Sequence, residues 1–343
     1  MKLIHLTRKM NWKFAAKILL STLGIFVSLE ATARFYYFGL DSFNFRKIDS
    51  FHELSHSGLI RLSEDPDLGY ELRPNLDAYF KMVRFATNSQ GFRDKERALS
   101  KPPRTFRVAV LGASYVMGSG IELEDTFHAV LENQLIRERK GMTYEFINMG
   151  VAAYSPWQLL AVVKRKALAY RPDLIFFAPY HTGYLYGPTR PRHSIPPVNH
   201  PFFNSYFKAL VQLRIAARLN RSKLQKGDAD RAKREKFRKH IDEIFSELGG
   251  IQKKTGIPVC VLFLEHREDS LYLVKEMEVP ARQHGLRLID ASEPFVCAGF
   301  PDYCAHPLDC HPNAAAHRVF ARVIYDFLLK DHLLEKAGTR NAL

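Results

Sequence analysis

Two short segments, far apart in the chain, carry residue types suited to nucleophilic acyl transfer. Ser114 follows Gly112-Ala113 directly after an apolar run of strand character, and Asp309 lies two residues before His311 in a loop near the carboxyl end. In an extended segment residues i and i+2 project to the same side, so the Asp309 carboxylate can orient the His311 ring. The other ring nitrogen is then free to take the proton of a serine hydroxyl, which is a poor nucleophile without such a base.

The turn around Ser114 differs from two better-known motifs. Val116 occupies the position of the second glycine of G-x-S-x-G, which argues against the nucleophile elbow of α/β-hydrolases, and no G-K-[ST] follows, which argues against a P-loop. Taken alone, Ser114 is better explained as a small residue in a tight turn. The Asp309 and His311 pair is what favours a nucleophile.

The elements that must position these residues alternate regularly from residue 105 onward. Short, almost continuous apolar runs predict five strands buried on both faces, and apolar residues at three- and four-residue spacing predict the helices between them. This pattern predicts a three-layer α/β/α sandwich with a five-stranded parallel sheet of flavodoxin-like type, whose ligand crevice lies beyond the carboxyl ends of the strands. The predicted strands are Arg107–Leu111, Tyr144–Met149, Leu174–Ala178, Val259–Leu264 and Arg287–Asp290, and the predicted helices are Asp125–Glu138, Pro156–Ala169, Arg231–Gln252, Leu271–Gln283 and Asn313–Leu329.

The amino terminus predicts a membrane segment. An apolar stretch over residues 14–34 follows Lys13 and precedes the aromatic run 35–38, and basic residues before it favour a cytoplasmic amino end. Ala31-Thr32-Ala33 resembles a signal-peptidase site, so a cleaved signal peptide is the rival of an uncleaved anchor. Either alternative exports the remainder of the chain. We expect a basic amino end (1–13), a signal-anchor (14–34), a small β-containing lead-in (35–104), a main domain (105–333) with an insertion (184–230), and a tail (334–343).

The positive charge of the chain lies mainly in one segment. The formal net charge is +14, and residues 214–239 hold eleven Lys or Arg against three acidic residues. Phe237, Ile241, Ile244 and Leu248 predict an apolar face opposite these charges, so we favour a solvated helix face over contact with anionic lipid. Nucleic-acid binding is disfavoured because export separates the chain from that ligand.

Three of the four cysteines lie within fourteen residues. In an oxidising compartment a disulfide among Cys297, Cys304 and Cys310 is expected, with Cys297 to Cys304 as one pairing that the sequence leaves open. Cys260 lies in an apolar strand and is expected to be a buried thiol. A zinc site built from Cys304, His306, Cys310, His311 and His317 is the alternative, disfavoured because no C-x-x-C pair is present. We therefore expect no metal and no cofactor.

In their order along the chain, four blocks resemble the SGNH hydrolase superfamily, also called GDSL-like lipases and esterases, in its membrane-anchored bacterial form. The blocks are Val110-Leu111-Gly112-Ala113-Ser114, Asn148-Met149-Gly150-Val151-Ala152-Ala153-Tyr154-Ser155, Pro172-Asp173-Leu174-Ile175-Phe176-Phe177 and Asp309-Cys310-His311-Pro312-Asn313, and Asn88-Ser89-Gln90-Gly91-Phe92-Arg93 is similar to the segment that precedes the first block in many anchored relatives. The resemblance covers residues 65–330. It implies Ser114 as nucleophile, His311 as general base and acid, and Asp309 as the residue that orients His311.

The resemblance also implies where an oxyanion would be stabilised. The amides of Ser114 and Gly150 are the expected backbone donors. The family's third donor is an asparagine after the third strand, which is absent here, and Thr182 or His181 is the expected substitute. Ala113 and Ala153 are two further departures from residues common in the family.

These observations lead to one expected function and its alternatives. We expect a single-pass protein of the bacterial inner membrane with a periplasmic SGNH-type domain, which hydrolyses or transfers an acyl group, such as O-acetyl, of a cell-surface polysaccharide through a seryl intermediate. The expected partners are that ester substrate and the membrane, without nucleic acid, and the oligomeric state is open. A degenerate domain that binds a glycan or a protein without turnover is the alternative.

Overall fold

A computed structural model describes residues 12–179, 194–201, 204–219, 227–268, 271–299 and 303–334. Its centre is a five-stranded parallel sheet in the order β6-β5-β7-β8-β9. The strands are β5 (Thr105–Gly112), β6 (Thr143–Asn148), β7 (Leu174–Ala178), β8 (Val259–Phe263) and β9 (Arg287–Asp290). This is the flavodoxin-like order, in which the first strand has neighbours on both sides and its carboxyl end opens into the crevice of the sheet. The predicted fold class is confirmed.

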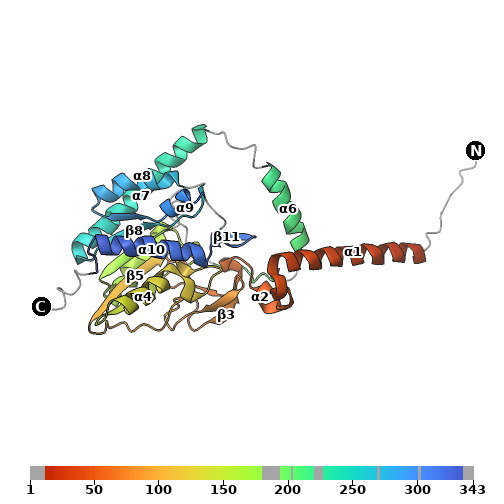
Figure 1. The fold of residues 1–343 in the computed structure, drawn as a ribbon, viewed down its shortest axis with the longest axis horizontal. Coiled ribbons are helices and arrows are strands. Elements are labelled where there is room, and N and C mark those ends of the chain that lie inside the picture. Colours follow the sequence, from red (N-terminus) through yellow and green to blue (C-terminus); the bar gives the residue numbers. More distant parts are fainter. Residues whose placement is uncertain are drawn as a thin grey trace, which may run out of the picture.

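The three central strands, β5, β7 and β8, are buried along their whole length because both faces of the sheet are covered. Alternate residues of β5 belong to different cores: Val108 and Val110 lie in one, Ala109 and Leu111 in the other. The first core packs against α4 (Phe127–Glu138) and α10 (Ala314–Lys330), and the second against α5 (Pro156–Arg165), α7 (Gly227–Thr255) and α8 (Tyr272–Gln283). The two helix layers lie on opposite sides of the sheet (Figure 1).

Three predicted helices have limits that differ by two residues or more from those expected, and one of them, α7, was predicted as Arg231–Gln252. Asp125 belongs to a 3-10 turn, η3 (Leu123–Asp125), and Thr126 is extended, so the α-helix begins at Phe127. The second helix, α5, begins at Pro156 as predicted, after a capping box between Ser155 and Gln158, but it ends at Arg165 and is followed by η4 (Ala167–Tyr170). The last turn before β7 therefore tightens, because the chain must reverse toward the sheet.

The lead-in is built from short elements packed beside the sheet. It comprises η1 (Gly39–Phe43), α2 (Phe45–Asp49), η2 (Leu54–His56) and two hairpins, β1 (Ile60–Leu62) with β2 (Tyr70–Leu72) and β3 (Asp77–Phe80) with β4 (Val83–Ala86). The largely apolar run from residue 79 to 85 folds back on itself at Lys81 and Met82. Phe80 and Phe85 are buried in the core shared with α5 and α7, which explains the apolar run.

A long helix, α1 (Trp12–Phe38), projects from the globular part (Figure 1). Among the described residues, the segment Trp12–Phe43 is the one that is long and apolar enough to cross a membrane, and its most apolar window is not buried against the rest of the chain. Only its last turns contact other elements: Ala33, Tyr37 and Phe38 are buried with Ile48 and Tyr206.

The insertion after β7 contributes α6 (Tyr206–Leu219) and leads into α7. Residues 180–193 lie outside the described residues. Phe237, Ile241, Ile244 and Leu248 of α7 are fully buried, as their spacing predicts, whereas the basic side chains of Lys236, Arg238 and Lys239 are exposed. The α9 helix (Glu293–Cys297) and the hairpin of β10 (Cys304–His306) and β11 (Asp309–Pro312) precede α10.

Candidate active site

Ser114 is the first residue of the short helix α3 (Ser114–Met117), directly after the carboxyl end of β5. Gly112 makes this tight junction possible: a Cβ there would lie 2.6 Å from the Ala178 carbonyl oxygen and 2.1 Å from Val116 Cγ2. Gly118 then ends the helix with a φ of +80°, which favours glycine. The turn therefore holds Ser114 at the edge of the sheet where parallel α/β folds bind ligands.

The β10–β11 hairpin brings the acid and the base together. Asp309 Oδ1 and His311 Nδ1 lie 2.6 Å apart, as the i and i+2 spacing predicts. Cys310 stands between them in the chain and forms a disulfide with Cys304 of the facing strand, so the pairing considered from the sequence, Cys297 with Cys304, is wrong. Cys297 is an exposed free thiol, and Cys260 is a buried one, as predicted.

Ser114, Asp309 and His311 line one cavity of about 550 Å³. The Tyr115 ring meets the His311 ring edge to face, with centroids 5.8 Å apart, which brings α3 against the hairpin. Among the described residues, no hydrogen bond joins the Ser114 hydroxyl to His311. Catalytic hydrogen bonds are often long in the absence of substrate and tighten only when it binds.

The carboxyl group of Asp309 has a second partner that sequence reasoning missed. Lys81 Nζ lies 2.8 Å from Asp309 Oδ2, and both side chains are largely buried, 6% and 13% exposed. Burial raises the pKa of Asp309, but the hydrogen bond and charge of His311, with those of Lys81, more than offset it and bring this pKa to about 2. Asp309 therefore stays ionised at physiological pH. The signal available in the sequence was a lysine within an otherwise apolar and aromatic run.

Gly150 does not take the role that the resemblance implied. Its amide donates to Asn148 Oδ1 at 2.9 Å, and a Cβ there would lie 2.5 Å from the Met117 amide nitrogen. Gly150 therefore allows the end of β6 to pack closely against α3. Ala153 lies on the cavity instead, with a φ of +64°, and among the described residues its amide has no hydrogen-bond acceptor.

Of the other expected oxyanion donors, the Ser114 amide lies at the start of α3, and no described residue accepts a hydrogen bond from it. The structure thus places two unpaired amides, those of Ser114 and Ala153, on residues that line the cavity. Thr182 and His181 lie outside the described residues.

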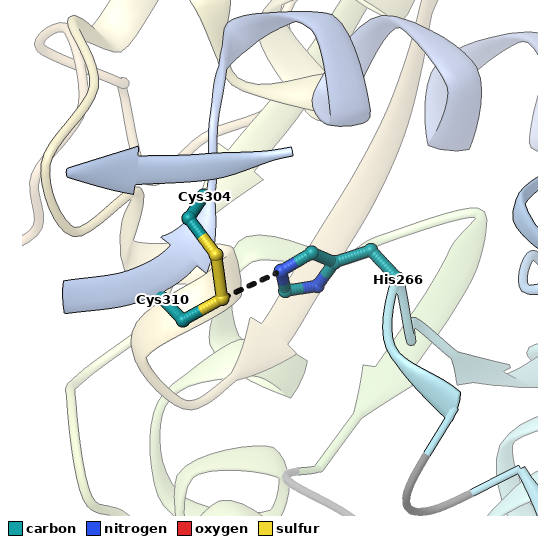
Figure 2. Close-up of side chains that lie close together, drawn as sticks. All are labelled: His266, Cys304 and Cys310. Atoms are coloured by element: carbon teal, nitrogen blue, oxygen red, sulfur yellow. Dashed lines mark hydrogen bonds between the residues drawn. A yellow bond between two sulfur atoms is a disulfide. The ribbon is translucent and has the colours of Figure 1, made fainter. Parts of the chain in front are cut away.

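The zinc alternative is not supported by the hairpin. Within the described part of the chain, His266, Cys304 and Cys310 form the one group with metal-ligand spacing, their ligand atoms lying within 4.8 Å of one another. Figure 2 shows that the two sulfur atoms are bonded to each other, with the His266 ring directed at Cys310. A disulfide offers no thiolate, and thiolates are what zinc requires of cysteine. His317, the last candidate, is buried and accepts a hydrogen bond from the Phe127 amide.

Comparison with known proteins gives a likeness of fold. No family model and no curated protein matches the sequence. An α/β hydrolase enzyme from the metagenome of Lake Arreo, Spain, is similar over 67% of this chain and 96% of its own, with 15% identity and a TM-score of 0.42. A member of the lipolytic protein G-D-S-L family from Veillonella parvula is similar over 64% of this chain and 97% of its own, with 14% identity and a TM-score of 0.41.

A two-domain esterase active on acetylated mannans, co-crystallised with mannopentaose, is similar over 66% of this chain, with 16% identity and a TM-score of 0.43. This chain covers 49% of that larger protein. These three structures are described as an α/β hydrolase enzyme, a member of a lipolytic family and an esterase. At this level of identity the likeness concerns the fold alone, so the chemistry of this chain has to be inferred from its own residues.

Proposed function

We propose that the chain is a serine esterase or O-acyltransferase in which Ser114 is the nucleophile, His311 the general base and acid, and Asp309 the residue that orients His311. One observation carries the proposal: the Asp309–His311 hydrogen bond of 2.6 Å lies on the wall of the cavity that Ser114 also lines. Its chemistry is acyl transfer, in which Ser114 Oγ attacks the ester carbon and His311 takes the serine proton and passes it to the leaving alcohol.

The two halves of the reaction need different groups. In the first half the developing oxyanion needs donors, and the amides of Ser114 and Ala153 are unpaired among the described residues. In the second half water or a sugar hydroxyl attacks the acyl-serine, with His311 as base. Hydrolysis and transfer therefore share one intermediate and differ only in the acceptor.

The cavity supports a carbohydrate ester as the substrate class. Tyr70, Tyr115 and Tyr154 line it with aromatic rings, and Ser55 and Ser155 add hydroxyl groups. Flat aromatic faces beside a few polar groups suit a ring-shaped polar ligand that carries a small acyl group. The apolar, unburied α1 supports a single-pass anchor, with the active-site domain on the periplasmic side of a bacterial inner membrane.

The experiment is labelling of the full chain in detergent with a fluorophosphonate probe, which reacts only with an activated serine. We expect the wild type to be labelled, and Ser114→Ala and His311→Ala to lose labelling by at least about a hundredfold. Ser246→Ala is the matched control, because Ser246 is an exposed serine of α7 that does not line this cavity, so its loss should leave labelling unchanged. A folded wild-type chain that takes up no label would contradict the proposal and favour a domain that binds without turnover.

A further inference from the structure

Lys81 reaches the candidate active site from the lead-in, more than two hundred residues from Asp309 in the sequence. Its ammonium group lies 2.8 Å from Asp309 Oδ2, while His311 Nδ1 lies 2.6 Å from Oδ1 of the same carboxylate. The carboxylate is thus held by two partners, one on each oxygen. Such an arrangement fixes its rotation about the terminal bond, which a single partner does not.

The backbone at Lys81 is held in an uncommon conformation. Lys81 and Met82 form the two-residue turn of the β3–β4 hairpin, with φ values of +49° and +75°. Turns of this kind favour asparagine and glycine, and positive φ costs other residues on the order of 1 kcal/mol each. Ser50 secures the turn: its carbonyl accepts from the Lys81 amide at 2.8 Å and its hydroxyl accepts from the Met82 amide at 3.0 Å.

Other charged and titratable groups lie near the pair, and one of them, His52 of the lead-in, packs on the Phe80 ring beside Lys81. Glu53 lies 4.0 Å from Lys81 and is exposed, and Arg267 lines the cavity from the loop after β8. His306 of β10 bonds to the Tyr37 carbonyl, His266 packs on Tyr115, and His317 of α10 bonds to the Phe127 amide. Of the lysines and arginines that the structure describes, Lys81 is therefore the one that lies within ion-pair distance of Asp309.

We propose, on the basis of the proposed function, that Lys81 is a positioning residue. It holds the Asp309 carboxylate in place beside His311, and it lowers the pH at which His311 becomes free to act as a base. The physical reason is competition for one negative charge. A carboxylate that already faces an ammonium group stabilises an imidazolium less than a carboxylate without that partner. Removal of Lys81 is therefore expected to move the acid limb of the pH–rate profile to higher pH.

The test measures the rate of fluorophosphonate labelling of the full chain against pH. We expect Lys81→Met to move the acid limb of the pH–rate profile to higher pH by about one unit. The same change should lower the maximal labelling rate, reached above that limb, by about tenfold. Lys81→Arg keeps the charge and should restore the limb toward its wild-type position. Lys47→Met is the matched control, because it removes a lysine from the same lead-in whose partner is Asp41, away from the cavity.

A double-mutant cycle separates an effect through Asp309 from a general structural one. If Lys81 acts through Asp309, Lys81→Met should not move the acid limb of the pH–rate profile any further in an Asp309→Asn background. An acid limb that stays in place in Lys81→Met, with the wild type labelled at Ser114, would overturn the role of Lys81 and leave the proposed function intact.

A second measurement does not depend on turnover. Titration of the His311 ring by NMR, in a chain labelled with ¹³C-histidine and assigned with His311→Gln, follows the same proton directly. We expect its midpoint to move to higher pH in Lys81→Met, and an unmoved midpoint would contradict the inference even if no label were taken up. Absence of labelling in the wild type would count against the proposed function alone.

Discussion

A single buried arginine connects the lead-in to the helix that carries the candidate nucleophile. Arg93 is 1% exposed and donates to the carbonyl oxygens of Met117 and Gly118 at the end of α3, and to that of Ile121 at 2.8 Å. Burial lowers the pKa of Arg93 to about 10, and no described carboxylate lies within ion-pair distance. The positive charge is held by carbonyl groups and by the Phe85 ring 4.9 Å away.

We predict that Arg93→Met lowers the free energy of unfolding by about 3 kcal/mol, because it leaves several buried carbonyls without a donor. The same change should reduce labelling of Ser114, since the end of α3 loses its support. Arg84→Met is the control: Arg84 is exposed and pairs with exposed Asp77, so the unfolding midpoint should stay close to that of the wild type. Denaturant unfolding and labelling rates check both expectations. Equal midpoints for the two variants would refute this role of Arg93.

At the scale of elements, the β10–β11 hairpin carries both Asp309 and His311 and is closed by the Cys304–Cys310 disulfide. The hairpin is short, and β11 packs against α3. We predict that replacing both cysteines with serine lowers stability by about 2 kcal/mol through the lost loop closure and lowers the labelling rate by about tenfold, because the acid–base pair is held less firmly.

The exposed free cysteine provides the matched control for that prediction. Cys297→Ser should change neither stability nor labelling, because Cys297 has no disulfide partner. Treatment of the wild type with dithiothreitol should reproduce the double substitution and leave the double variant unaffected. Labelling that is indifferent to the reductant in the wild type would show that the disulfide does not support the site.

The elements of this fold differ in how far the sequence predicts them. The three central strands, β5, β7 and β8, were predictable because each is buried along its whole length and therefore almost continuously apolar. The contact of Asp309 with His311 was predictable because it is local. Lys81 was not, because its turn has no glycine or asparagine and its partner lies in a distant hairpin. The Ala153 amide was missed for a similar reason: its φ of +64° is unusual for alanine.

At the scale of the whole molecule, the projecting helix and the candidate active site are structurally connected. His306, on the strand paired with β11, bonds to the Tyr37 carbonyl at 3.0 Å, and its ring stacks on Phe38 at the end of α1. Glu30 of α1 also accepts hydrogen bonds from the amides of Tyr206 and Phe207 at the start of α6. The helix proposed as the anchor therefore packs on the hairpin that carries Asp309 and His311.

The buried histidines of the domain make its stability depend on pH. Burial lowers the pKa of His128 to about 4 and that of His317 well below its usual value. The His128 ring contacts the Val116 carbonyl of α3, and His317 Nδ1 accepts from the Phe127 amide. Between pH about 6.5 and about 4 the unfolded chain binds protons on these rings and the folded chain does not. The free energy of unfolding therefore falls as the pH falls through this window.

We predict that the wild type loses on the order of 3 kcal/mol per fully buried ring across this window, measured by urea unfolding in detergent from about pH 7.5 to about pH 4.5. His128→Gln should be less stable at neutral pH, because it perturbs a buried contact, but its stability should fall less steeply toward acid. His200→Gln is the control, since the His200 ring is exposed beside Asp49 and its loss should leave the slope unchanged. If His128→Gln kept the wild-type slope, proton uptake by His128 would not drive the acid sensitivity, and the ionised pairs of the lead-in would have to account for it.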